Sequence, residues 1–404
     1  MHNRKNRIQQ WMHQVAERMK PWVIVGGGMV GATAALTLAD QGYSVVLLEP
    51  KPETEFDPTS AYDLRISAIT ADNIAQLNAL GVWESVVNQR AQRFDELAVR
   101  EQQGPWVEFA GRGGEPLGFM VENKLLQRLL QERCKKHPLV HVKIDGFARI
   151  DTNETDACAV VTSAGDEIPY SGLLGADGAQ SSVRKALGLG TAGSSYRERC
   201  LLVNVETEKA LPPRTWQIFA DQEVHALLPL STHHACLIVY ANHDQVLVHS
   251  ANEQTLMPWM QTRFAHHIGN FKFQGFGSFP LRHQQVLTPW SHRFQGGVIG
   301  DAAHAVHPLA GQGVNLGFRD VQGIASALKH CRDEDAVAAV AGALATRQRE
   351  NMLMGCGLDA IAKGFRSQNP LIQAARRGLF HGLSMQPQLR AWIGRIAGGR
   401  LLSR

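Results

Sequence analysis

The chain has 404 residues, of which 44% are hydrophobic and 19% charged, so it can build the core of two domains or of one large one. No run of eighteen apolar residues occurs, and the basic first twenty residues lack an apolar stretch. We therefore expect neither a membrane-spanning helix nor a secretory signal. The six cysteines stand singly without a C-x-x-C pair, which is typical of reduced thiols in a reducing compartment.

The net charge of +4 conceals an uneven distribution. Residues 1–20 carry a net +4 and residues 360–404, which contain no acid, a net +8, so the middle of the chain carries −8. Two basic ends on an acidic body predict an anionic partner, either a membrane surface or nucleic acid. No helix-turn-helix pattern and no aromatic-lined basic groove is visible, so we expect no nucleic-acid partner. Helical spacing of apolar residues over 8–19 predicts an extra helix on the body or a frayed tail.

The first motif is a strand, a glycine turn, a helix and a second strand that ends at Glu49. Gly26 permits the tight turn, Gly28 lets a pyrophosphate approach the backbone, and Gly31 lets helix and strand pack closely. Glu49 would accept a hydrogen bond from an adenosine ribose. This complete βαβ context predicts a dinucleotide site and disfavours a 2′-phosphorylated ligand.

Arg65 lies in the next ordered stretch and has two interpretations. It is either a surface strand residue or a residue that faces the ring or the pyrophosphate of a bound cofactor. The elements predicted here are a loop over 51–62, a strand over 63–69, a helix over 71–80, hairpin-like strands over 94–120, an amphipathic helix over 121–131 and a strand over 140–144.

A second glycine–acid motif follows a short apolar strand and contains Asp177 and Gly178. Alone it is a tight turn before a helix that the following serines can cap. Together with the first motif, it predicts a second contact with the same bound dinucleotide.

Residues 195–285 change character. Short strand-like runs (200–205, 215–219, 225–230, 235–240 and 273–279) and one helix over 253–267 predict a mainly antiparallel sheet that covers the active face. The adjacent histidine pairs there lack the spacing of metal ligands, so no metal site is expected.

The third motif begins where an apolar run ends in Gly300 and Asp301. A small-residue turn leads to His307 and Pro308, and then to Gly311, Gln312, Gly313 and a helical pattern from Val314. An acid at a strand end and bare backbone at a helix start suit a ribose and an electron-rich ring. The helical pattern continues to about residue 364, and Asn369 and Pro370 then interrupt it. Residues 371–404 have an amphipathic basic pattern. This pattern fits a docked helix pair or a membrane-surface contact, and we favour the contact because acids are absent.

The three motifs in this order resemble the single-component FAD-dependent aromatic hydroxylases, over residues 21–365. Within that group, the stretches 63–68 and 307–320 are similar to the ubiquinone-biosynthesis hydroxylases. The runs 120–124, 215–219 and 227–230 are most similar to the branch that hydroxylates 2-polyprenyl-3-methyl-6-methoxy-1,4-benzoquinol.

This resemblance implies an α/β fold: a Rossmann-like FAD-binding domain with an inserted, mainly antiparallel substrate sheet and a helical C-terminal region. The implied parts are an N-terminal extension (1–20), the FAD-binding domain (21–95, 120–195 and 286–365), the substrate domain (96–119 and 196–285) and basic amphipathic C-terminal helices (366–404).

The resemblance also implies roles for single residues. Glu49 would bind the adenosine ribose, Asp301 the ribityl or pyrophosphate side, and Asp177 would lie near FAD and NAD(P)H. No catalytic base is visible, since a structural role is favoured for His304 and His307. The residues expected around the flavin ring are His307, Pro308, Gly311, Gln312 and Gly313; the other expected FAD contacts are Gly26, Gly28, Gly31, Arg65, Gln127, Gly178, Gly300, Val314 and Asn315.

The implied reaction uses NAD(P)H to reduce FAD and O2 to form a flavin C4a-hydroperoxide, which hydroxylates a polyprenylated quinol or phenol. The implied location is the cytoplasmic face of the membrane, with room for a multi-enzyme ubiquinone-pathway complex. Three rival interpretations stay open: a hydroxylase of a small soluble phenol, a non-hydroxylating flavin reductase or oxidase, and a NAD-binding protein without catalysis.

Overall fold

The structure is a computed structural model, and it describes most of the chain between residues 20 and 386. The described residues are 20–53, 55–102, 104–111, 114–152, 158–220, 222–306, 311–329, 331–367, 369, 371–374, 376, 378, 382 and 386. The helix expected over 8–19, His307, Pro308 and most of the C-terminal region lie outside these residues.

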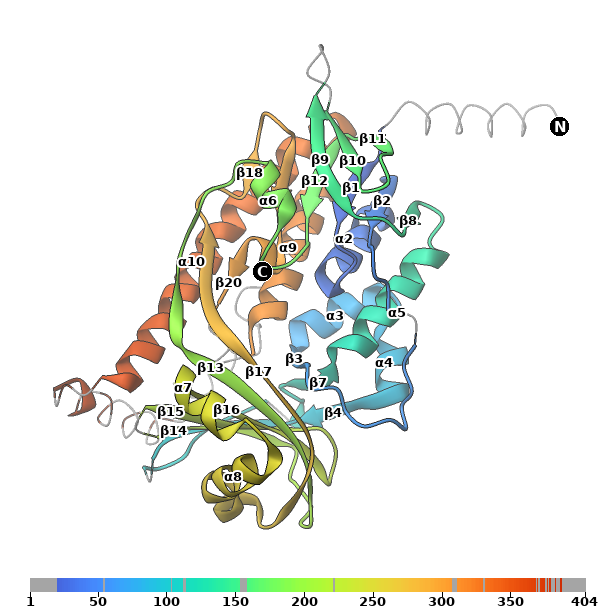
Figure 1. Cartoon of the computed structure of the whole chain (residues 1–404). Coiled ribbons are helices and arrows are strands. Elements are labelled where there is room, and N and C mark those ends of the chain that lie inside the picture. The colour runs from blue at the N-terminus through green and yellow to red at the C-terminus, as the bar shows by residue number, and fades with distance from the viewer. Residues whose placement is uncertain are drawn as a thin grey trace, which may run out of the picture.

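A six-stranded, mostly parallel sheet forms the centre of the cofactor half (Figure 1). The first βαβ unit supplies two of its strands, which pair in parallel from Trp22↔Val45 to Val25↔Leu48. Alternate residues of the first strand face opposite layers, because side chains alternate across a strand: Ile24 packs with the helices and Val23 with the opposite side. In sheet order, the strands are β18 (Trp290–Ser291), β19 (Gly296–Val298), β12 (Gly172–Gly175), β1 (Trp22–Val25), β2 (Val45–Leu48) and β8 (Val140–Lys143).

Helices cover one face of this sheet, and a small sheet and a short helix cover the other. The helical layer shares one buried cluster with β1, including Leu36, Leu125 and Phe318. The helices are α2 (Met29–Asp40), α3 (Ala71–Ala79), α4 (Trp83–Arg90), α5 (Asn123–Lys136), α9 (Gly313–Leu328) and α10 (Ala336–Arg366), with 3-10 turns η2 (Gly300–Ala302) and η4 (Asp333–Asp335). The opposite layer contains α6 (Ser182–Ala186), β9 (Phe147–Thr152), β10 (Cys158–Thr162) and β11 (Glu167–Pro169).

An eight-stranded sheet forms the other half of the molecule. Its outer face packs on α8, where Leu201 and Leu237 meet Phe264, while Cys200 and Leu202 face the opposite way. In sheet order, the strands are β20 (His304–Ala305), β17 (Phe271–Val286), β13 (Thr191–Thr207), β16 (His234–Asn242), β15 (Glu223–Pro229), β14 (Arg214–Ala220), β5 (Glu96–Glu101) and β6 (Val107–Ala110). The helices α7 (His243–His249) and α8 (Glu253–Ile268) follow β16, and a three-stranded sheet of β3 (Ile66–Thr70), β7 (Gly118–Glu122) and β4 (Ala91–Phe94) completes the fold.

The predicted α/β class and the largely antiparallel second sheet are confirmed. Two strands of that sheet, however, are much longer than the sequence predicts. Runs expected over 200–205 and 273–279 are parts of β13 and β17, which pair from Thr191↔Val286 to Thr207↔Phe271. Bulges and three residues unfavourable in strands (Gly275, Gly277 and Pro280) interrupt the apolar alternation that marks a strand. The boundary expected at 195/196 therefore falls inside β13, and α7 was not predicted. Figure 1 shows β13 and β17 running as long arrows between the two halves.

Candidate active site

The first two glycine motifs meet at the carboxyl end of the central sheet. Gly26 has a φ of +99°, and a Cβ there would lie 2.6 Å from the Ala176 carbonyl oxygen. A Cβ on Gly31 would lie 1.9 Å from the Gly26 oxygen, so helix and strand pack as closely as the motif predicts. Gly28 instead faces open space along a large cavity. The backbone conformation at Gly26, the close packing at Gly31 and the open space beside Gly28 thus explain why glycine occupies each position.

Glu49 stands at the end of β2 beside this turn. Its Oε2 accepts a hydrogen bond from the Gly27 amide at 2.7 Å, and its Oε1 accepts one from the Lys51 amide at 2.8 Å. Glu49 therefore holds the glycine turn to β2. Its contact with an adenosine ribose stays a prediction.

Asp177 uses its carboxylate within the protein. It accepts hydrogen bonds from the amides of Ser182 at 2.7 Å and Val183 at 3.2 Å, and from the Ser181 hydroxyl. Ser181 in turn caps α6 by accepting from the Arg184 amide. The carboxylate thus fixes the start of α6, and it is the neighbouring Gly178 that lines the cavity.

The third motif rests on a buried carboxylate, Asp320, from α9. Its Oδ2 accepts from the Gly300 amide at 3.1 Å and lies 2.6 Å from His304 Nε2. Its Oδ1 accepts from Arg347 Nε at 3.3 Å and Asn351 Nδ2 at 2.9 Å, both on α10. We call Asp320, His304, Arg347 and Asn351 the Asp320 cluster; it fixes the turn from which Asp301 enters the cavity.

The pKa values of His304 and Asp320 shift in opposite directions, because each group stabilises the charge of the other. Burial opposes a charge on His304, but the charge and hydrogen bond of Asp320 prevail and raise the pKa of the imidazole. Burial likewise opposes ionisation of Asp320, and His304 and Arg347 prevail, so the pKa of this carboxyl is lowered. Asp301 has accessible surface in the cavity, yet burial by the surrounding protein raises its pKa against the effect of His304 and Arg65.

Gly311, Gln312 and Gly313 line the cavity at the start of α9. Asn315 does not line it; its Nδ2 donates to the Gly311 oxygen at 3.1 Å and to the Ala68 oxygen at 2.7 Å. Its side chain therefore ties the glycine turn to β3. The helix start offers backbone N–H groups and roughly half a positive charge, which suits an electron-rich ring.

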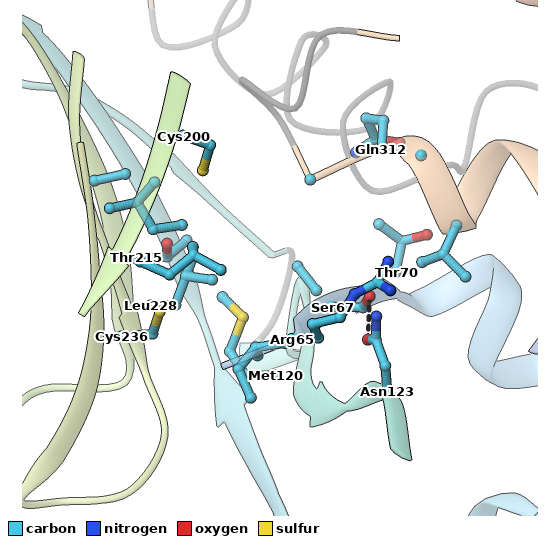
Figure 2. A pocket seen from close by; sticks show the side chains of 18 of the residues that line it. Arg65, Ser67, Thr70, Met120, Asn123, Cys200, Thr215, Leu228, Cys236 and Gln312 are labelled. Atoms are coloured by element: carbon cyan, nitrogen blue, oxygen red, sulfur yellow. Dashed lines mark hydrogen bonds between the residues drawn. The ribbon is translucent and has the colours of Figure 1, made fainter. Parts of the chain in front are cut away.

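β3 and α5 form the facing part of the polar wall (Figure 2). Arg65, Ser67, Asn123 and Gln127 line the cavity there, and Ser67 Oγ donates to Asn123 Oδ1 at 2.6 Å. Arg65 thus lies at the cavity, where one of its two interpretations had placed it. Ser67 and Asn123 were not singled out in the sequence, because a serine and an asparagine flanking strand and helix carry no spacing signal.

The cavity has a volume of about 1290 Å³ and two chemically different walls. The wall from the eight-stranded sheet is largely apolar, and Figure 2 shows Cys200, Thr215, Leu228 and Cys236 across the space from Arg65, Ser67 and Gln312. Of the expected cofactor contacts, those that line the cavity are Gly28, Arg65, Gln127, Gly178, Asp301, Gly311, Gln312, Gly313 and Val314. The other expected contacts do not line the cavity. They support the turns beside it or the residues that line it, and they are Gly26, Gly31, Glu49, Asp177, Gly300 and Asn315.

The polar wall fits FAD. Gly28 leaves its backbone open to the cavity, two glycine turns (Gly178 and Gly311) approach with positive φ, and a helix start faces the same space. These features are what a pyrophosphate and an electron-rich ring require.

Comparisons with known proteins agree with this site. The profile of a family described as FAD binding domain matches residues 20–349. The solved structure of p-nitrophenol 4-monooxygenase PnpA from Pseudomonas putida DLL-E4 shares the fold, with a TM-score of 0.73 over 93% of this chain and 96% of that chain at 19% identity. The family profile and the site therefore define an FAD-binding protein, and its fold is the one seen in this monooxygenase.

Two relatives narrow the class. The 3-demethoxyubiquinol 3-hydroxylase of Escherichia coli K12 is 34% identical over 87% of this chain and 92% of its own length. Ubiquinone hydroxylase UbiL of Rhodospirillum rubrum is 28% identical over 90% of this chain and 85% of its own length. The chain belongs to the family of FAD-dependent ubiquinone-biosynthesis hydroxylases.

Proposed function

We propose that the chain uses NAD(P)H and O2 to hydroxylate the ring of a polyprenylated quinol or phenol in ubiquinone biosynthesis. The main support for this proposal is the cavity between the two halves of the molecule, in which a polar cofactor wall faces an apolar wall. Its volume of about 1290 Å³ exceeds the range of about 300–1,000 Å³ for one drug-sized ligand. It therefore has room for a flavin ring and a second organic molecule.

The printed names of the relatives support the substrate class. One is a 3-demethoxyubiquinol 3-hydroxylase and the other a ubiquinone hydroxylase, and both align with most of this chain. The runs 120–124, 215–219 and 227–230 belong to β7 and the start of α5, to β14 and to β15, and members of each line the cavity. The runs on β14 and β15 therefore fall on the apolar wall, while the run 120–124 supplies Asn123 and Lys124 to the polar side of the cavity.

The roles of the residues follow from the two walls. Bound FAD would pass two electrons from NAD(P)H to O2, so that one oxygen atom of O2 enters the substrate ring and the other leaves as water. Gly311 and Gly313 would hold the edge of the flavin, Asp301 its ribityl or pyrophosphate side, and Arg65 and Gln127 would help to retain it. The apolar wall would exclude water and orient the substrate ring, which protects the reactive oxygen and aligns the carbon to be attacked.

The same substrate explains the charge distribution. Each buried CH2 of an isoprenoid chain contributes about 0.8 kcal/mol, so such a substrate stays in the bilayer. Among the described helices, none is both long and apolar enough to cross a membrane. We therefore infer that the basic C-terminal region brings the enzyme to the cytoplasmic face of the membrane, where a pathway complex would also assemble.

Oxygen labelling tests this function. The purified protein, loaded with FAD and supplied with NAD(P)H, ¹⁸O2 and a prenylated quinol, should form a product with one ¹⁸O atom. Asp301→Ala, expected to fold but to lose FAD, is the control. Consumption of NAD(P)H with peroxide as the only product would contradict hydroxylation. Turnover of simple phenols but not of prenylated ones would contradict the substrate class.

A further inference from the structure

The exposed residues that line the cavity form a polar group and an apolar group, which we call its polar end and its apolar end. At one end, the exposed lining residues are polar and include Arg65, Lys124 and Asp301. At the other, they are apolar: Phe279 on β17 is 43% exposed, Ile372 is 42% exposed, and Ala360 on α10 is also exposed. The polar end contains the residues that fit FAD, so the apolar end has a different occupant.

A strip of α10 continues the apolar end outward along the surface. Ala360 and Gly364 come seven and eleven residues after Leu353, so the three positions fall on one face of a helix with 3.6 residues per turn. Ala360 and Gly364 line the cavity, while Leu353 does not line it and is 72% exposed. The same face of α10 thus has cavity-lining residues at one end and an exposed apolar side chain two to three turns before them.

An ion pair fixes the rim of this opening. Arg376 also lines the cavity, and its guanidinium is paired with Glu101 at the end of β5; both side chains are nearly buried. A second donor of Arg376 bonds the Gly364 carbonyl oxygen at 3.0 Å. The charge is therefore neutralised at the wall, and the same residue holds α10 and β5 at a set separation.

Resting on the proposed function, we propose that the prenyl chain of the substrate leaves the cavity through this opening, between Phe279 and Ile372 and along Ala360 and Gly364. We call this opening the tail portal. The ring then lies between the apolar wall and the flavin on the polar wall, and the chain contacts only apolar side chains and a paired guanidinium.

Two physical arguments favour this path. The polar end would place an isoprenoid chain against Arg65, Lys124 and Asp301, and it would displace the cofactor from the residues that fit it. The tail portal instead continues the apolar surface that a hydrocarbon chain needs over its whole length, and burial of such surface is favourable in proportion to its area. It also opens beside Arg376, which is one of the eight basic residues of the acid-free stretch 360–404, the part of the sequence that we expect to meet the membrane.

Binding of quinols that differ only in chain length tests the portal. FAD-loaded protein is titrated without NAD(P)H, and the dissociation constant is read from the change in flavin absorbance. Ile372→Glu and Phe279→Glu should weaken binding of a triprenyl quinol at least about tenfold and leave binding of the tail-free quinol within about twofold. Ile144→Glu is the matched control, because Ile144 is 67% exposed and does not line the cavity; it should bind both quinols like the wild type.

A photoreactive group at the end of the triprenyl chain gives a second, turnover-independent reading. It should label α10 and the segment around Ile372. Labelling around Arg65 and Lys124, or unchanged affinity in both portal variants, would overturn the proposal. Failure of the wild type to bind or hydroxylate even the tail-free quinol would instead refute the proposed function, so the two failures are distinguishable.

Discussion

Gly26 is where the first two motifs touch, and this makes its substitution informative. Alanine there would meet the Ala176 carbonyl and adopt a φ of +99°, whereas alanine at Gly42 would adopt a similar φ of +93° with open space around it. We expect Gly42→Ala to cost about 1–3 kcal/mol of unfolding free energy and to keep FAD affinity. Gly26→Ala should cost more and weaken FAD binding at least about tenfold.

Urea unfolding and fluorescence titration with FAD would measure both quantities. Equal losses of FAD affinity in the two variants would show that backbone strain alone, rather than the contact between the motifs, accounts for the effect.

Prediction from the sequence works for the turn at Gly26 and for the close packing at Gly31 because these two reasons are local: both lie within the motif. The contact of Gly26 with Ala176, which lies in the second motif, could not be read from the spacing of the first. Asp177 and Asn315 are different, because a carboxylate and an amide have many partners to choose from. Asn315 bonds Ala68, which is 247 residues away, so no spacing rule could distinguish a cofactor contact from an internal tie.

At the scale of elements, the Asp320 cluster joins α9, α10 and β20, and its ionisation sets a stability window. The pKa of His304 is raised, so its contribution is complete below about pH 6.5 and is lost as the pH rises through its folded pKa. The pKa of Asp320 is lowered, so its contribution is complete above about pH 4 and is lost as the pH falls through its folded pKa. The cluster therefore stabilises most between about pH 4 and 6.5.

Asp320→Asn should lower the unfolding free energy within this window by up to about 3–5 kcal/mol, because it removes the buried carboxylate that pairs with Arg347 and His304 and leaves Arg347 with only the more exposed Glu350 among the described residues. It should also remove the loss of stability that we expect of the wild type as the pH rises above 6.5 and through the folded pKa of His304. Asp72→Asn is the matched control, since Asp72 pairs with the buried Arg319 at 2.8 Å without a histidine. Denaturant unfolding across the pH range measures both, and an unchanged slope above pH 6.5 in Asp320→Asn would contradict the assignment.

The βαβ unit, α5 and α8 could be predicted from the sequence for different reasons. The βαβ unit has its glycine motif, α5 has a strong apolar periodicity, and α8 has clear ends, because Asn252 caps its start and Gly269 follows its end. The length of β13 and β17 could not be predicted. A 17-residue strand such as β13 passes from one core to another, so different segments face different neighbours and no single apolar alternation marks it. The Asp320 cluster could have been suspected from the adjacent Arg319 and Asp320 in an otherwise apolar helix, which is an arrangement typical of buried ion pairs.

At the scale of the whole molecule, the cavity could be seen only in the structure, whereas the uneven distribution of charge could be seen in the sequence. The cavity between the halves depends on how two sheets face one another, and spacing along the chain gives no measure of that. The charge asymmetry, in contrast, is visible in the sequence alone. Arg376 lines the cavity and is paired with Glu101, whereas the proposed membrane contact concerns the arginines that follow it in the sequence.

A C-terminal truncation can separate binding to the membrane from binding of the substrate at the tail portal. Removing residues 377–404 deletes five arginines and leaves Ile372 and Arg376 in place. Because each basic residue near an anionic surface contributes about 1 kcal/mol, binding to phosphatidylglycerol vesicles at low salt should fall by more than about a hundredfold. Binding to neutral vesicles and FAD content should stay unchanged. Vesicle co-sedimentation across a salt series measures this effect, with Arg4, Lys5 and Arg7 changed together to Gln as the control for the other basic end. If that control loses the affinity and the truncation keeps it, the N-terminal end is the membrane contact, and the arginines beyond the portal have another role.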